Sequence, residues 1–315
     1  MKILITGCGM LGTDLCEILS GENEIHGIDI KQSTYHLPLT TYHSLDITDF
    51  EKTYKTITKI NPEIVIHTAA WTDVDGAEKN PTDAYRLNVL GTRNIALACQ
   101  RFDATMVYIS SDYVFDGEKK EPYIEFDKAN PLSVYGKSKY YGELIVQQLL
   151  NKFFIVRSSW LYGANGKNFV KTIINLAQEK KPGRFACGEE LKIVNDQIGC
   201  PTYTKDLAEA IKVLLTTYHL PLTTGLYGTY HITNSESCSW YEFAKEIVKH
   251  VGTNSFVQNA GCKVLPTTTE EFKRPAKRPK NSILKNFMWE LNGFEPLRNW
   301  QEALSDYLKD NTDKR

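Results

Sequence analysis

The feature that most constrains this chain is a glycine-rich hexapeptide between an apolar run and a helical pattern. The apolar run, residues 2–6, is typical of a buried strand. It is followed at once by Gly7-Cys8-Gly9-Met10-Leu11-Gly12, a G-x-G-x-x-G at the start of a helix. We expect Gly7 to permit the tight turn, Gly9 to let the backbone approach a pyrophosphate, and Gly12 to let the helix pack on the strand. Free N–H groups at the helix start add partial positive charge, so the motif predicts dinucleotide binding.

Acidic residues after the next strand refine the predicted cofactor site. Asp29 ends the second strand, seventeen residues past Gly12, where a carboxylate would accept hydrogen bonds from ribose hydroxyls. This favours NAD, whereas Lys31 could bind a 2′-phosphate, so NADH and NADPH both remain open. Asp46 and Ile47 are expected to flank the adenine ring, with a helix N-cap as the alternative interpretation of Asp46.

The order of apolar and helical segments predicts the fold class. Further strands are expected at residues 24–29, 64–67, 105–109 and 153–156, and they alternate with helical patterns at about 49–59, 83–101 and 138–150. Such alternation predicts an α/β fold, a doubly wound parallel sheet of the Rossmann type, over residues 1–156. Glycine and proline become frequent afterwards, so residues 157–315 are expected to form mainly a smaller α/β substrate-binding domain. Within this second part, the chain could return to the first sheet over about residues 190–232.

A tyrosine and a lysine form the candidate catalytic pair. Tyr135 and Lys139 stand four residues apart, on one face at the start of a predicted helix. A tyrosine with a pKa of about 10 is a poor proton donor at neutral pH, and a nearby ammonium would lower that pKa. Ser111, at the end of an apolar strand, could hydrogen-bond the same substrate oxygen. The alternatives are an amphipathic helix face for the pair and a strand-end cap for Ser111.

Composition excludes several classes of function. The chain has 37 basic and 38 acidic side chains, so its near-zero net charge gives no electrostatic case for nucleic acid or an anionic membrane surface. No apolar run reaches the roughly 18–20 residues of a membrane span, and the seven cysteines form no C-x-x-C or Cys/His metal spacing. We expect a reduced, cytoplasmic chain without a secretory signal or a metal site.

Several segments resemble a known family. The glycine loop, the candidate catalytic residues and His67-Thr68-Ala69-Ala70 resemble the extended short-chain dehydrogenase/reductases. Longer segments are similar to signatures of dTDP-4-dehydrorhamnose reductases, and the resemblance runs from residue 1 to about 305. These segments are SSDYVFDG (110–117), VYGKSK (134–139), RSSWLYG (157–163), NDQIGCPT (195–202) and RPKNS (278–282).

The resemblance implies a reaction and a set of site residues. The reaction is reduction of the 4-keto group of dTDP-4-dehydro-L-rhamnose to dTDP-L-rhamnose by NADPH or NADH. By resemblance, Tyr135 is the proton donor, Lys139 holds the nicotinamide ribose, and Ser111 replaces a threonine usual in the family. The implied cofactor-binding residues are Gly7, Gly9, Met10, Leu11, Gly12, Asp29, Ile30, Asp46, Ile47, Ala69, Ala70, Tyr135 and Lys139. The implied substrate-binding residues are Thr72, Val74, Ser111, Asp112, Tyr113, Trp160 and Arg278.

Two departures from the family and two other functions stay open. The family loop is usually G-x-x-G-x-x-G, one residue longer than here, and Trp71 stands where smaller or imidazole side chains are common.

One alternative function is a nucleotide-sugar epimerase or dehydratase on the same scaffold. The other is a non-catalytic partner like the regulatory subunit of methionine adenosyltransferase. Interdomain packing is the alternative role for Trp160, and a homodimer is a further possibility.

Overall fold

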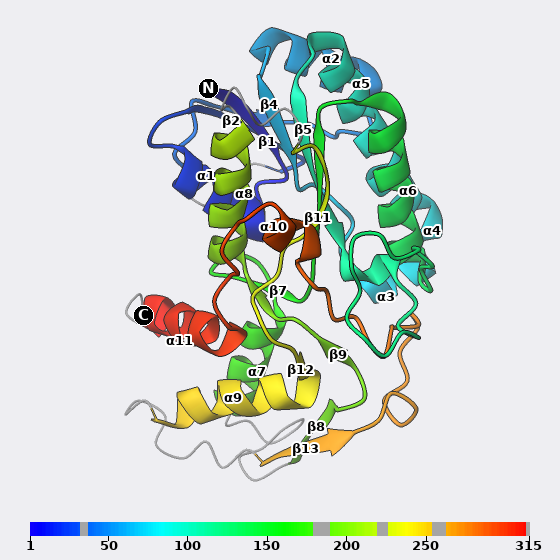
Figure 1. Cartoon of the computed structure of the whole chain (residues 1–315), viewed down its shortest axis with the longest axis vertical. Coiled ribbons are helices and arrows are strands. Elements are labelled where there is room, and N and C mark those ends of the chain that lie inside the picture. The colour runs from blue at the N-terminus through cyan, green and yellow to red at the C-terminus, as the bar shows by residue number, and fades with distance from the viewer. Residues whose placement is uncertain (32–36, 179–189, 219–225, 254–262, 313–315) are drawn as a thin grey trace.

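A seven-stranded parallel sheet forms the larger part of the computed structural model, which describes residues 1–31, 37–178, 190–218, 226–253 and 263–312 (Figure 1). The strand order is β11-β6-β5-β4-β1-β2-β3, the doubly wound order with one strand added at the β6 edge. This confirms the predicted fold class. The strands are β1 (Lys2–Thr6), β2 (Glu24–Asp29), β3 (Thr41–Ser44), β4 (Ile64–His67), β5 (Thr105–Ser111), β6 (Phe153–Ser158) and β11 (Gly228–His231).

Helices cover both faces of this sheet, as right-handed crossovers require (Figure 1). On one face α1 (Met10–Leu19) packs against α8 (Thr204–Tyr218), with an apolar core that includes Leu15 and Ile211. On the other face α5 (Thr92–Phe102) lies between α2 (Phe50–Ile60) and α6 (Val134–Leu149). Because both faces are covered, the central strands β1, β4 and β5 are buried almost throughout.

Three differences between the predicted elements and the structure stand out within residues 1–156. Strand β3 was not predicted, because its sequence TYHS is short, polar and only partly buried. The helical pattern at 83–101 is interrupted: α4 (Pro81–Tyr85) leads into a π-helical stretch, Arg86–Gly91, before α5 begins. Helix α6 begins at Val134, earlier than predicted, because the Ser133 hydroxyl caps it by accepting from the Gly136 N–H at 3.1 Å.

A smaller unit lies below the carboxyl ends of the central strands (Figure 1). Its core gathers aromatic and aliphatic residues from α7 (Phe169–Gln178), α9 (Trp240–Thr253) and α11 (Trp300–Thr312). Short strand pairs complete it. These are β7 (Leu161–Tyr162) with β10 (Thr202–Tyr203), β8 (Glu190–Val194) with β13 (Lys263–Thr267), and β9 (Ile198–Gly199) with β12 (Cys238–Ser239).

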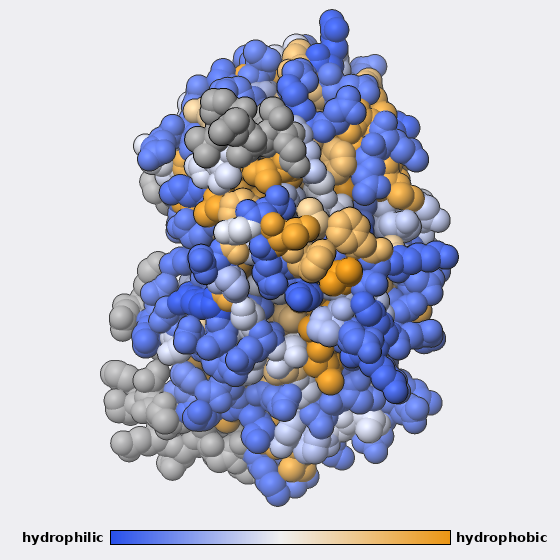
Figure 2. All heavy atoms as spheres, viewed as in Figure 1, coloured by the Kyte–Doolittle hydropathy of each residue, from blue (hydrophilic) through white to orange (hydrophobic). Residues whose placement is uncertain are grey.

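The chain crosses between the two units more than once. After β8 in the smaller unit, α8 packs on α1 and β11 pairs with β6 in the large sheet. The remaining short elements pack on the large unit: α3 (Val74–Lys79) and the 3₁₀ turn Asp112–Val114 contact α6, and α10 (Phe287–Leu291) contacts β11. The face in Figure 2 is mostly hydrophilic, with apolar side chains gathered over and beside α10. No helix among the described residues is long and apolar enough to span a membrane.

Candidate functional site

A cleft of about 630 Å³ opens at the carboxyl ends of the strands of the large sheet, where α/β proteins bind ligands. It brings together every predicted site residue except Gly12 and Arg278. From the glycine loop and β2 come Gly7, Gly9, Met10, Leu11, Asp29 and Ile30; from the next connections come Asp46, Ile47, Ala69, Ala70, Thr72 and Val74. From β5, α6 and the smaller unit come Ser111, Asp112, Tyr113, Tyr135, Lys139 and Trp160.

The glycine loop has the geometry that its sequence predicts at two positions. Gly7 has a φ of +84°, and a Cβ there would lie 2.5 Å from the Ala69 nitrogen. A Cβ on Gly12 would lie 2.1 Å from the Gly7 carbonyl oxygen, which explains the close approach of α1 to the loop. Gly9 is the N-cap of α1, and a Cβ added there would meet no atom within 4 Å, so this side of it faces open space. The helix start has no side-chain cap, which leaves its N–H groups to a ligand.

These environments predict different effects for two alanine substitutions. Gly12→Ala should lower the free energy of unfolding by about 1–3 kcal/mol, because the new methyl group meets rigid backbone. Gly9→Ala should destabilise the protein less than Gly12→Ala does. It should act mainly by weakening NADPH binding, because Gly9 lines the cleft and its added methyl group meets open space. Thermal unfolding and NADPH titration of both variants test this pair. Equal losses of stability would contradict it.

Two carboxylates lie at the predicted ribose and adenine end. Asp29 Oδ2 accepts from the Cys8 N–H at 2.8 Å, and its Oδ1 accepts from the Ile30 N–H at 2.7 Å. Asp29 thus fixes the glycine loop to the end of β2. The alternative that Asp46 caps a helix is wrong, because Asp49 is the N-cap of α2 and accepts from Lys52 N. Asp46 instead accepts from the Thr48 N–H at 2.9 Å in a local turn.

Tyr135 and Lys139 are both buried at the inner end of the cleft. Burial raises the pKa of Tyr135 to about 12, while a hydrogen bond with Ser111 acts in the opposite direction. Burial also lowers the pKa of Lys139 to about 7, and the charge of Glu143 acts against that change. The predicted lowering of the Tyr135 pKa by the ammonium is therefore not seen, since burial dominates. The phenol is protonated at neutral pH, the form that can donate a proton.

Aromatic rings hold the pair in place. The Lys139 ammonium lies 4.2 Å from the centre of the Tyr108 ring, and the Tyr108 hydroxyl donates to the Lys139 carbonyl at 3.1 Å. The Tyr113 ring packs edge-on against Tyr135, with ring centres 5.6 Å apart. Both side chains are therefore packed in place on the first turns of α6.

Ser111 and Asp112 form one hydrogen-bonded turn at the end of β5. The Ser111 hydroxyl donates to Asp112 Oδ1 at 2.9 Å and accepts from the Tyr113 N–H at 3.2 Å. Ser111 thus caps the 3₁₀ turn, as its structural alternative predicted, and also lines the cleft. Asp112 is buried, and burial raises its pKa to about 6 despite hydrogen bonds that lower it.

Trp160 forms the wall on the side of the smaller unit. Its indole stacks on that of Trp240 with ring centres 3.5 Å apart and planes 7° apart. Its backbone has a φ of +48°, unusual for a bulky residue. A Cβ on Gly199 would lie 2.5 Å from this indole, so the ring is closely backed. Trp160 therefore packs on the core of the smaller unit and also lines the cleft, so its contacts do not distinguish a substrate-binding role from interdomain packing.

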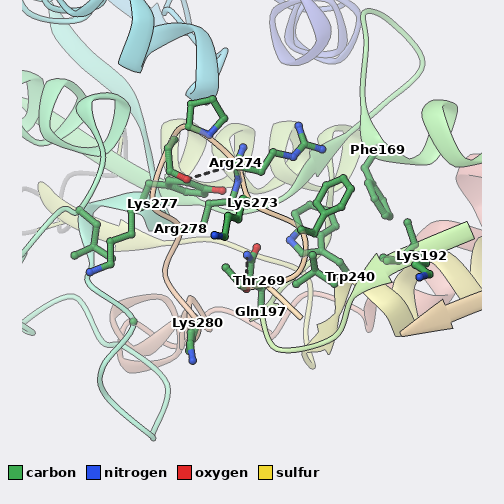
Figure 3. A pocket seen from close by; sticks show the side chains of 18 of the residues that line it. Phe169, Lys192, Gln197, Trp240, Thr269, Lys273, Arg274, Lys277, Arg278 and Lys280 are labelled. Carbon is green, nitrogen blue, oxygen red and sulfur yellow. Dashed lines mark hydrogen bonds between the residues drawn. The ribbon is translucent and has the colours of Figure 1, made fainter. Parts of the chain in front are cut away.

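A second, larger cavity of about 1280 Å³ adjoins the cleft, and Tyr113 and Trp240 line both. Figure 3 shows Lys277, Arg278 and Lys280 toward one end of it and Phe169 and Trp240 toward the other. Its basic lining residues are Lys192, Lys273, Arg274, Lys277, Arg278 and Lys280, and its acidic ones are Asp116, Glu118 and Glu190. Such a lining suits a ligand that combines an anionic group, which the cations can bind, with a flat ring, which the aromatic side chains can contact.

Arg278, predicted to meet a diphosphate, lies in this second cavity and already has a partner. Its Nη1 and Nη2 donate to the two oxygens of Asp75, each at 3.0 Å. Burial lowers the pKa of Arg278, but the hydrogen bonds to Asp75 and the interaction with Tyr113 more than offset it and raise that pKa. Part of the donor capacity of Arg278 is therefore used within the protein.

Several residues of the two cavities were missed from the sequence. They include Lys167 and Trp240 in the cleft, and Phe169, Lys192 and Gln197 in the second cavity. Two signals were available: Gln197 lies in the segment 195–202 that carries the resemblance, and the basic, proline-containing stretch 273–280 forms much of the lining of the second cavity, but sequence alone does not connect either to the site. Trp240 gave no signal, because only the fold places it against Trp160.

The structure describes five of the seven cysteines, one of which, Cys8, lies in the glycine loop. Cys8, Cys16, Cys99, Cys200 and Cys238 are buried free thiols, while Cys187 and Cys262 lie outside the described residues. In the part of the chain that the structure describes, no cluster of three or more His, Cys, Asp or Glu side chains could hold a metal ion.

Comparison with known proteins gives consistent matches over the whole chain. The family described as "RmlD substrate binding domain" matches residues 1–312. The spore coat polysaccharide biosynthesis protein SpsK of Bacillus subtilis is 39% identical, over 98% of this chain and 97% of its own. The dTDP-4-dehydrorhamnose reductase of Aggregatibacter actinomycetemcomitans is 36% identical over 97% of each chain. The crystal structure of dTDP-4-dehydrorhamnose reductase from Bacillus anthracis in complex with NADP has a TM-score of 0.85 and 43% identity, covering 98% of this chain and 99% of that one.

Proposed function

The chain belongs to the RmlD substrate binding domain family, and from this premise we propose that it reduces the 4-keto group of dTDP-4-dehydro-L-rhamnose to give dTDP-L-rhamnose. Relatives that cover almost the whole chain are named as dTDP-4-dehydrorhamnose reductases, so the chain is an oxidoreductase that uses NADPH or NADH. The observation that best supports the specific reaction is the convergence of Tyr135, Lys139 and Ser111 in one cleft with the glycine loop.

The glycine loop and the end of β2 fit a dinucleotide. Gly9 presents open space toward the cleft at the start of α1, where N–H groups can donate to phosphate oxygens. Asp29, Ala69 and Ala70 line the cleft, and the Asp29 carboxylate would accept hydrogen bonds from the adenosine ribose. A reduced nicotinamide bound here supplies the hydride.

The proton comes from the protein. Tyr135 is protonated at neutral pH and would donate its phenolic proton to the substrate oxygen as that oxygen gains negative charge. The Lys139 ammonium would stabilise the phenolate that remains. Ser111 would position the same oxygen, and the hydride and the proton together complete reduction of the carbonyl group to an alcohol.

The second cavity is the proposed site of the nucleotide. Its basic residues would bind the diphosphate, and Phe169 and Trp240 would contact flat or apolar parts of the ligand. Trp160, Thr72, Val74, Asp112 and Tyr113 would then surround the sugar between this cavity and the catalytic pair. We accordingly propose that the large sheet holds the cofactor and the smaller unit grips the nucleotide sugar.

One assay tests this function against its nearest alternative. The purified protein should oxidise NADPH when dTDP-4-dehydro-L-rhamnose is added, and the product should be a dTDP-sugar with no carbonyl group. A nucleotide-sugar epimerase would instead interconvert its substrates without net consumption of NADPH. Consumption of NADPH at the background rate with this substrate would refute the proposed reaction.

A further inference from the structure

One carboxylate of the cofactor-binding unit ties down the basic segment of the second cavity. Asp75 lies in the first turn of α3, directly after Val74. Its Oδ1 accepts from the Ala276 N–H at 3.1 Å and from Arg278 Nη1 at 3.0 Å. Its Oδ2 accepts from Arg274 Nη1 at 3.2 Å and from Arg278 Nη2 at 3.0 Å. Three residues from one short segment, about 200 positions away in the sequence, thus converge on a single side chain.

Asp75 and its three partners, Arg274, Ala276 and Arg278, form a clamp with specific geometry. The paired donation from Arg278 fixes the plane of its guanidinium, which a single contact would not do. The side chains of Asp75 and Arg278 are only 19% and 17% exposed, so water competes weakly for this pair. Burial alone would raise the pKa of Asp75, but hydrogen bonds from Arg278 and Ala276 more than offset it and keep that pKa below its usual value.

The same segment is held at its other end. Gly117, with a φ of +79°, lies so close to it that a Cβ would be 2.6 Å from Pro279 and 2.7 Å from the Lys280 nitrogen. The Asn281 amide donates to the Lys119 carbonyl at 2.7 Å. Residues 274–280 therefore bridge α3 and the loop that follows β5, and their basic side chains line the cavity between these anchors.

The clamp also reaches the catalytic tyrosine through one intermediate. The Arg278 guanidinium interacts electrostatically with Tyr113, and the Tyr113 ring packs edge-on against Tyr135. A shift of Arg278 would therefore move a wall that the two cavities share.

We propose that Asp75 is a positioning residue for the substrate diphosphate: by holding Arg278, Arg274 and the Ala276 backbone, it fixes the basic wall of the second cavity in its binding arrangement. This rests on the proposed function, because it takes a nucleoside diphosphate as the ligand. Asp75 does not touch the ligand in this proposal and acts through Arg278. The negative charge of Asp75 would by itself repel an anionic ligand. Asp75 therefore favours binding only through the positions in which it holds its partners.

The test is the affinity for dTDP, measured by titration calorimetry without any turnover. Asp75→Asn should bind dTDP about tenfold more weakly than wild type. The substitution removes the negative charge of residue 75, so Arg278 and Arg274 are held less firmly. Its affinity for NADPH should change less than twofold. Asp83→Asn, the same change at an exposed site on the neighbouring helix α4, is the matched control and should bind dTDP like wild type.

A double-mutant cycle separates positioning from a general structural role. In an Arg278→Gln background, Asp75→Asn should have almost no further effect on dTDP affinity, because its main partner is gone. If the Asn variant does not fold, Asp75→Glu keeps the charge and should weaken dTDP binding about two- to fivefold. Unchanged or tighter dTDP binding by the Asp75 variant, or additive effects in the cycle, would overturn the inference. A wild type that binds no dTDP would overturn the proposed nucleotide as well.

Discussion

Tyr135→Phe should reduce kcat by about 10²- to 10⁴-fold, the usual contribution of a positioned general acid. The substitution removes one hydroxyl and keeps the ring that packs edge-on against Tyr113. Because that hydroxyl is protonated at neutral pH, its loss removes the proposed proton source from the cleft. The rate is measured as NADPH oxidation at saturating dTDP-4-dehydro-L-rhamnose.

Binding and a matched variant show whether the loss is chemical. Affinities for NADPH and dTDP should stay within about twofold of wild type, since the phenolic oxygen contributes chiefly in the transition state. Tyr141→Phe makes the same change on helix α6, at a tyrosine that is 48% exposed and packs against Tyr85 outside the cleft. It should keep wild-type kcat. A Tyr135→Phe variant with more than a tenth of wild-type kcat would show that another group donates the proton.

The local chemistry of the cleft was predictable because it is encoded in short contiguous segments. The glycine loop, Asp29 and the Tyr135/Lys139 pair each occupy the end of a strand or the start of a helix, and a parallel sheet gathers such ends at one edge. The environment of these groups was not predictable. The high pKa of Tyr135 and the low pKa of Lys139 depend on burial, which sequence spacing does not reveal.

The substrate side was harder to predict because its contacts are long-range. Resemblance points to Arg278 as a site residue, but its pairing with Asp75 joins residues 203 positions apart. The Trp160–Trp240 stack likewise exists only once α9 packs against the segment after β6. The π-helical stretch Arg86–Gly91 also escaped prediction, since its apolar spacing resembles that of an ordinary helix.

A buried ion pair joins helix α6 to the large sheet. Glu143, with no exposed surface, accepts from Arg157 Nε at 2.9 Å and from Arg157 Nη2 at 2.7 Å. It also accepts from the Ser110 hydroxyl at 2.5 Å, so it joins α6 to β5 and β6. The Arg157 guanidinium lies 5.2 Å from the centre of the Phe115 ring, and its side chain is only 6% exposed to water.

Glu143→Gln should therefore lower the free energy of unfolding by about 3–5 kcal/mol, because it leaves the buried Arg157 charge without its partner. The control is Glu246→Gln, the same change in a pair whose Lys249 side chain is 69% exposed, where the loss should be about 0–1 kcal/mol. Replacing both members, as in Glu143→Gln with Arg157→Met, should recover part of the stability, since no charge then stays buried unpaired. Urea unfolding followed by circular dichroism measures all three. Equal losses for the two single variants would mean that the pair contributes no more than one at the surface.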